Sequence, residues 1–94
     1  MRSPLAGAVV ANLSPALADE LSLDPFGSGV IVLRVRPDSI ARRLGFRPGD
    51  IVRGVNGGAV SRVPELLEAL KQPVQDWRIE IERDGQRVAL QVRG

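Results

Sequence analysis

The chain has 94 residues and a net charge of +2, and it contains neither cysteine nor histidine. This length fits one domain with a modest core, and no apolar run reaches the roughly eighteen residues of a membrane span. The two missing residue types exclude disulfides, thiolate or imidazole zinc sites, and any Ser-His-Asp or Cys-His catalytic arrangement. We therefore expect no metal and no cofactor.

The basic residues are almost all arginine, and they are scattered along the chain. They alternate with eleven acidic residues, and Arg42 and Arg43 form the only adjacent pair. A nucleic-acid binder more often shows a clustered basic patch with aromatic residues for stacking, whereas this chain has three aromatic residues in all. We expect no nucleic-acid partner.

The N-terminal residues 1–4 lack the apolar segment of a secretory signal peptide. We interpret Met1 as a cloning start and residues 1–3 as disordered or introduced with it. The chain would then be a single domain over 1–94 cut from a larger protein, whose targeting signal is hidden.

The first elements are a short strand over residues 9–13 and a short helix over 15–22. Ser14 is a good N-cap and Pro15 suits the first helical position. Leucine and alanine residues then recur at helical spacing, which predicts an amphipathic helix.

The next segments are a loop over residues 23–29 and the strongest strand of the sequence over 30–35. Pro37 ends this strand. Asp38 or Ser39 then caps a second short helix.

The second helix is expected over residues 40–44, with Gly45 as its natural stop. A turn and a strand over 51–55 follow. Asp50 in that turn is interpreted as a residue that bonds nearby backbone amides, not as a catalytic acid. Asn56-Gly57-Gly58 tolerates positive φ and predicts a tight turn, with a brief returning strand at 59–60.

A third helix begins at Ser61 or Arg62 and ends before Pro73. Its apolar residues follow the i, i+3, i+4, i+7 pattern of an amphipathic helix: Val63, Leu66, Leu67 and Leu70. We assign Leu66 to the core and the other three to an exposed face. Val63 and Leu67 fit the core equally well.

The C-terminal part predicts a hairpin. Residues 77–83 alternate strictly between apolar and polar, Asp84-Gly85 forms the turn, and residues 88–92 alternate in the returning strand. The sum is an α+β, mainly β fold: a small, partly open antiparallel barrel of five or six strands, with one longer helix and two short ones.

At residues 45–52 and 55–57 the sequence resembles a PDZ domain: a small-residue helix, an apolar residue after glycine, a Gly-Asp turn, a strand and Asn-Gly. The resemblance extends over about residues 5–92. Within the family it is most similar to the bacterial, circularly permuted kind, as in the second PDZ domain of periplasmic Do-like serine proteases. Site-2 proteases and C-terminal processing proteases also carry PDZ modules and remain alternative parents.

The resemblance implies a groove that captures an extended peptide by strand addition, with backbone amides meeting the terminal carboxylate. Ala6, Gly7 and Ala8 would provide those amides. Small alanines on both sides of the glycine imply a roomier or less well-formed pocket. The implied peptide-binding residues are Leu5, Ala6, Gly7, Ala8, Val9, Val10, Val63, Leu67 and Leu70.

In this reading, Leu70 is the main residue of the pocket for the last ligand side chain. Val63 stands where many PDZ domains have a histidine that selects serine or threonine, which favours an apolar ligand residue here. The implied function is binding of C-terminal or extended apolar segments in a periplasmic protease, for substrate recruitment, regulation or oligomer assembly.

The expected partners are therefore C-terminal or unfolded segments, with the protease domain or neighbouring subunits as further possibilities. The main alternative is a structural interaction domain whose groove is filled by a neighbouring chain or linker. An enzyme is not expected, because the sequence offers no nucleophile-base pair and no acid-base pair.

Overall fold

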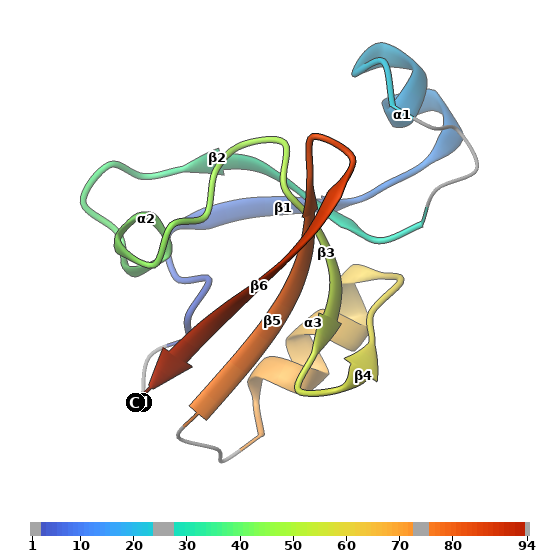
Figure 1. Cartoon of the computed structure of the whole chain (residues 1–94). Coiled ribbons are helices and arrows are strands. Elements are labelled where there is room, and N and C mark those ends of the chain that lie inside the picture. Colours follow the sequence, from blue (N-terminus) through green and yellow to red (C-terminus); the bar gives the residue numbers. More distant parts are fainter. Residues whose placement is uncertain (1–2, 24–27, 73–75, 94) are drawn as a thin grey trace.

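The computed structural model describes residues 3–23, 28–72 and 76–93, which form a curved sheet flanked by helices (Figure 1). None of the helices among these residues is both long enough and apolar enough to cross a membrane. The elements in chain order are β1 (Ala8–Asn12), α1 (Pro15–Glu20), β2 (Val30–Val35), α2 (Ile40–Arg43), β3 (Ile51–Val55), β4 (Gly58–Ala59), α3 (Val63–Leu70), β5 (Asp76–Arg83) and β6 (Gln86–Arg93).

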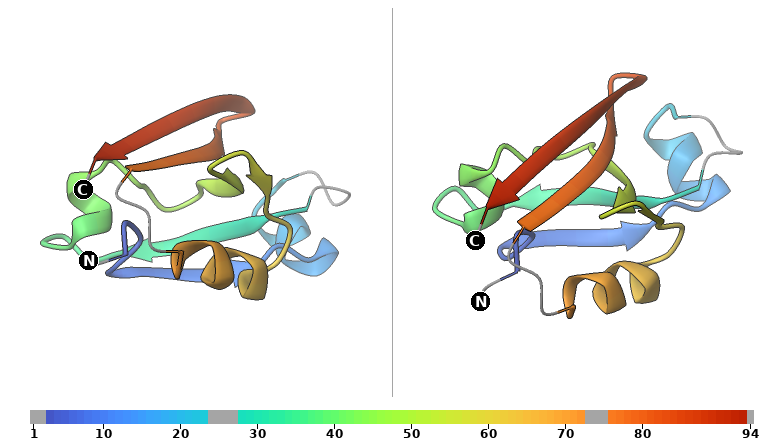
Figure 2. Two further views of the ribbon diagram at one scale, coloured as in Figure 1. Left: turned by 90° about the horizontal axis from the view of Figure 1, so that it is seen from below. Right: turned by 60° about the horizontal axis from the view of Figure 1, so that its bottom comes forward.

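The strands form one antiparallel sheet in the order β1-β2-β3-β5-β6, and β4 pairs with β3. β1 and β6 lie at opposite ends of this order, so the sheet is open. The expected mainly β fold with one longer helix and two short ones is confirmed. The two views of Figure 2 show α3 running alongside β1.

Several predicted boundaries move by one or two residues. The first strand starts at Ala8 instead of residue 9 and ends at Asn12. The first helix ends at Glu20 instead of residue 22, and Ser22 takes a positive φ of 58° that a right-handed helix cannot hold. Ser39 caps α2, since its Oγ accepts a hydrogen bond from the Arg42 N–H at 3.2 Å.

The predicted return strand at residues 59–60 forms at Gly58–Ala59 instead. Asn56 and Gly57 take φ values of 50° and 85°, so the chain reverses at these two residues and pairing resumes directly after them. Three sequence predictions concern residues outside the described ones: the start of the chain at 1–2, most of the loop at 23–29, and the helix stop at Pro73.

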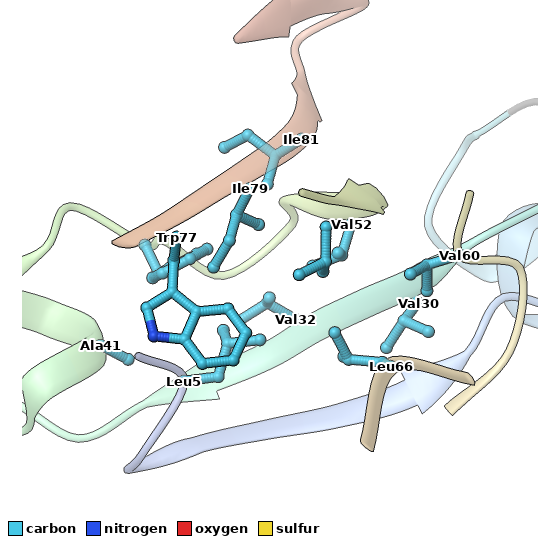
Figure 3. Packing of buried hydrophobic residues seen from close by; sticks show 12 residues of the cluster. Leu5, Val30, Val32, Ala41, Val52, Val60, Leu66, Trp77, Ile79 and Ile81 are labelled. Carbon is cyan, nitrogen blue, oxygen red and sulfur yellow. The ribbon is translucent and has the colours of Figure 1, made fainter. Parts of the chain in front are cut away.

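The core lies between the sheet and α3 (Figure 3). Leu66 of α3 is buried, as predicted, together with alternate residues of β5, whose side chains point inward. Trp77, Leu5 and Ala41 belong to the same buried cluster. The core therefore joins α3, the central strands and the loop that precedes β1.

An ion pair between the buried Asp50 and the half-buried Arg83 fixes the turn between α2 and β3 to the end of β5. Asp50 is 1% exposed, and its Oδ2 accepts a hydrogen bond from the Arg47 N–H at 2.8 Å. The Arg83 guanidinium donates to both carboxylate oxygens, at 2.8 and 2.7 Å, and to the Gly45 carbonyl at 2.8 Å. The hydrogen bonds to Asp50 raise the pKa of Arg83 above its ordinary value.

We predict that Arg83→Met lowers the free energy of unfolding by about 3 kcal/mol, because it leaves the buried Asp50 carboxylate without its charged partner. Arg87→Met is the matched control, since its pair with Glu80 is exposed and should contribute no more than about 0.5 kcal/mol. Urea unfolding of the two variants and the wild type measures both. Equal stability of the variants would contradict the structural role of the buried pair.

Candidate functional site

The outer edge of β1 is the candidate binding edge. Within the part of the chain that the structure describes, β1 pairs only with β2. Two hydrogen bonds mark the ends of this pairing, each at 3.0 Å. The Gly7 carbonyl accepts from the Arg36 N–H, and the Leu13 N–H donates to the Gly29 carbonyl. Backbone groups alternate in direction along an antiparallel strand. Ala8, Val10 and Asn12 therefore direct theirs away from β2, toward the free edge.

The helix α3 flanks this edge and is joined to it by one hydrogen bond. The Asn12 Oδ1 at the end of β1 accepts from the Val63 N–H at the start of α3, at 2.6 Å. Val63 and Leu70 are half-buried and pack against the core. The strip between β1 and α3 is called the β1–α3 seam below, and it is the surface to which the sequence assigned ligand binding.

On β1, the side chains that face the seam are small. Ala8 and Val10 are half-buried and pack against the core, on one face of the strand. Val9 is 51% exposed, its side chain lies on the other face and its backbone groups face β2, so neither is directed toward the seam. Leu67 is 50% exposed on α3. It lies one helical turn from Val63, as an exposed flank of the same helix.

The loop before β1 is held by its carbonyl groups. The Ala6 carbonyl accepts from the Ala41 N–H at 3.1 Å, and the Gly7 carbonyl accepts from the Arg36 N–H at 3.0 Å. In a planar trans peptide unit the N–H points opposite to the C=O. The N–H groups of Gly7 and Ala8 therefore point away from α2 and β2, toward the free edge of β1.

Two of the three expected amides already have partners inside the loop. The Ala6 N–H donates to the Ser3 carbonyl and the Ala8 N–H donates to the Leu5 carbonyl, each at 3.0 Å. None of the described residues accepts a hydrogen bond from the Gly7 N–H. Leu5 is 7% exposed and belongs to the core, so it supports the loop from behind.

Positive charge lies on the α2 side of the loop before β1. Arg36 and Arg43 are exposed and, with Asp38, line a shallow cavity that also contains Ala6 and Gly7. The two guanidinium groups exceed the one carboxylate, so this side of the loop favours an anion.

Asn12 is the residue of this site that sequence reasoning missed. It was treated as the end of a strand, whereas its side chain caps a helix that starts 51 residues later. The sequence signal that could have indicated this contact lies at the start of α3. The N-cap position of α3 is Arg62, whose side chain has no acceptor, so the first amides of α3 need an acceptor from elsewhere.

A family model described as PDZ domain matches residues 31–93. A probable periplasmic DegP-like serine endoprotease of Marinomonas sp. (strain MWYL1) is 30% identical over 88 residues, which cover 92% of this chain and 19% of that protein. Its namesake from Chlamydia pneumoniae is 35% identical over 65 residues, covering 69% of this chain and 13% of that protein. The chain thus spans less than a fifth of the length of these two relatives.

Two solved structures are similar over 93% of this chain. The HtrA3 PDZ domain bound to a phage-derived ligand, FGRWV, is 29% identical with a TM-score of 0.77, and 80% of that chain is covered. The HtrA-type protease AlgW with a decapeptide is 30% identical with a TM-score of 0.80, and 27% of that chain is covered. These likenesses confirm the fold expected from the sequence.

We predict that Gly7→Ala destabilises the domain more than Gly45→Ala does. Both glycines have a positive φ, 91° and 100°, which costs an alanine about 1–2 kcal/mol. At Gly7 the new Cβ would also overlap the Ser39 Cβ, which adds roughly 1–3 kcal/mol of overpacking, whereas at Gly45 the space is empty. Thermal and urea unfolding compare them, and an equal loss of stability would show that the loop can move away from α2.

Proposed function

The chain belongs to the PDZ domain family, and we propose that it binds C-terminal or extended apolar polypeptide segments by adding them as a strand to β1. The carrying observation is the free edge of β1 beside the apolar side of α3. An added strand would bond to the outward backbone groups of Ala8 and Val10, which supply affinity for any sequence.

The loop before β1 is the proposed site for the ligand carboxylate. The Gly7 N–H would donate to it directly, and the Ala8 N–H would exchange the Leu5 carbonyl for it. This exchange is favourable because a hydrogen bond to a carboxylate is stronger than one to a neutral carbonyl. The ligand carboxylate therefore competes with a bond that already exists, which lowers the affinity below that of an open loop.

The proposed pocket for the last ligand side chain lies between Leu70, Ala8 and Val10, with Leu5 beneath it. All four side chains are apolar and contact or belong to the core. This lining supports a preference for an apolar last residue. The ligand solved with the HtrA3 PDZ domain, FGRWV, also ends in an apolar residue. Leu67 and Val63 would contact residues further from the ligand end.

We propose further that this domain is a module of a periplasmic DegP-like serine endopeptidase, in which it serves substrate recruitment, regulation or oligomer assembly. The relatives with that description support this, as do the HtrA-type structures. The catalytic residues would lie in the rest of such a protein.

A structural interaction domain is the second candidate. It is favoured by the internal hydrogen bonds of the Ala6 and Ala8 amides, which suit a loop that seldom meets a free carboxylate. In that case β1 would be covered by a linker or a neighbouring subunit. Sedimentation of the isolated domain together with a peptide titration separates the two candidates. A monomer that binds a free peptide supports the ligand site, whereas a self-associated domain, or a monomer that binds no peptide, favours the structural role.

We predict that a peptide with a free apolar C-terminus binds at least about tenfold more tightly than the same peptide as its C-terminal amide. The carboxylate gains charge-assisted hydrogen bonds from the Gly7 and Ala8 amides that the neutral amide cannot match. Isothermal titration calorimetry with a pair of peptides ending in valine measures the ratio. Equal weak affinities would remove the carboxylate from the proposal.

We predict that Leu70→Lys abolishes binding of the same peptide while the domain stays folded, because it places an ammonium group in the proposed apolar pocket. Leu21→Lys is the control: Leu21 follows α1, is 44% exposed and lies outside the seam, so its replacement should leave the affinity unchanged. Circular dichroism checks the fold. Unfolding of the Leu70→Lys variant alone would assign Leu70 to the core.

A further inference from the structure

The sheet has a second free edge, formed by β6 and called the β6 edge below. Within the part of the chain that the structure describes, β6 pairs with β5 alone and ends the strand order opposite β1. Figure 2 shows β6 well apart from α3. All eight residues of β6 keep a regular register with β5, and none of them is proline. Such an edge offers a row of backbone groups to another chain.

The register decides which backbone groups point outward. Asp84 and Gly85 take φ values of 52° and 78°, as in a type I′ turn, which places a hydrogen-bonded residue pair directly beside it. The groups then alternate in direction along β6. Arg78 agrees with this, because its N–H and C=O bond to Asn56 at 2.6 and 2.8 Å and so face away from its partner Gln91. Four residues of β6 therefore direct both groups to the free edge: Arg87, Ala89, Gln91 and Arg93.

The side chains of β6 form two rows with different chemistry. Val88, Leu90 and Val92 pack against the core but are only half-buried, so each keeps part of its surface exposed. On the opposite face Arg87 and Arg93 are exposed, and β6 contains no acidic residue. A strand added to this edge would therefore meet apolar side chains on one face of the sheet and positive charge on the other.

We propose that the β6 edge binds an extended polypeptide segment in which apolar and acidic residues alternate. Its apolar side chains would cover the half-buried row, and its carboxylates would lie opposite Arg87 and Arg93. Arg87 already pairs with Glu80 at 3.2 Å, but this pair is exposed and is easily exchanged for a ligand carboxylate. A second copy of this chain fits the edge less well, because two β6 strands bring arginines together without a carboxylate from either strand.

The β6 edge is independent of the proposed function at β1. Among the described residues no hydrogen bond joins β6 to α3 or to the loop before β1, whose amides would meet a terminal carboxylate. The β6 edge therefore takes an internal segment and needs no free C-terminus. A domain with both sites would hold a C-terminal segment at one end of the sheet and an acidic extended segment at the other.

The test uses the peptide Glu-Val-Thr-Val-Thr-Val-Glu, acetylated and amidated so that it has no terminal carboxylate. Placed opposite residues 87–93, its valines meet the apolar row and its glutamates meet Arg87 and Arg93. The charge-reversed peptide Lys-Val-Thr-Val-Thr-Val-Lys, with the same caps, is the control. We expect it to bind at least about tenfold more weakly in calorimetric titrations at low salt, with a smaller difference at high salt because the edge is exposed.

Two variants of one residue test the backbone contact. Ala89→Pro removes an outward N–H, which β5 does not use, at an edge position where proline is tolerated. Ala89→Val is the matched control, because it keeps the N–H and suits a strand. We expect Ala89→Val to bind the acidic peptide within about threefold of the wild type, and Ala89→Pro at least about tenfold more weakly. Circular dichroism checks that both variants fold.

Amide hydrogen exchange locates the bound peptide and decides the question even if Ala89→Pro fails to fold. We expect the acidic peptide to slow exchange at Ala89 and Gln91 and to leave Ala8 and Val10 of β1 unchanged. Protection at Ala8 and Val10 instead would place the peptide on β1, which overturns the β6 site and leaves the proposed function standing.

Three other outcomes also overturn the β6 site. They are binding of neither capped peptide, equal binding of both, and undiminished binding by a folded Ala89→Pro variant. None of them bears on free C-termini at β1. A dimer that forms without peptide and is lost in Ala89→Pro would make a second copy the occupant, and the proposed acidic segment would then be wrong.

Discussion

Two backbone hydrogen bonds, from Ala41 to the Ala6 carbonyl and from Arg36 to the Gly7 carbonyl, set the geometry on which the proposed site depends. These bonds hold the two loop carbonyls toward α2 and β2. Because the peptide unit is planar, the N–H group that follows each carbonyl points the opposite way, toward the free edge of β1. Glycine is required here, because its positive φ and its close approach to Ser39 leave no room for a side chain. The loop is thus oriented by the fold behind it, before any ligand arrives.

The secondary structure could be predicted largely from local patterns. The alternation of β5 and the spacing of Leu66 in α3 report directly which side is buried, because a strand and a helix expose their faces at fixed periods. The two interactions that lock the structure could not be found in this way. Arg83 meets Asp50 from 33 residues away, and Asn12 meets Val63 from 51 residues away. Such partners depend on how the elements meet, and no local propensity encodes that.

The location of the candidate site could be predicted from the sequence, but its detailed geometry could not. The resemblance led to the loop and to α3, and the structure does bring β1 and α3 together. It also buries Leu5, turns the Val9 side chain to the opposite face and engages the Ala8 amide within the loop. These details depend on the pairing register with β2, which shifts between Val9 and Val10, and on a turn whose hydrogen bonds involve Ser3. Neither follows from residue types at given spacings.

The two ends of the seam differ chemically, and in the proposed function this difference would set the direction of the ligand. At the start of β1 the loop offers N–H groups that suit an anion, while at its end the Val63 N–H is already satisfied by the Asn12 Oδ1. Under the proposed function, a ligand carboxylate would lie beside Gly7, and the rest of the ligand would run from there toward Asn12. Read from its own N-terminus, such a ligand is antiparallel to β1. Antiparallel pairing is also the arrangement of every strand pair already in the sheet, so the added strand would continue its hydrogen-bond pattern.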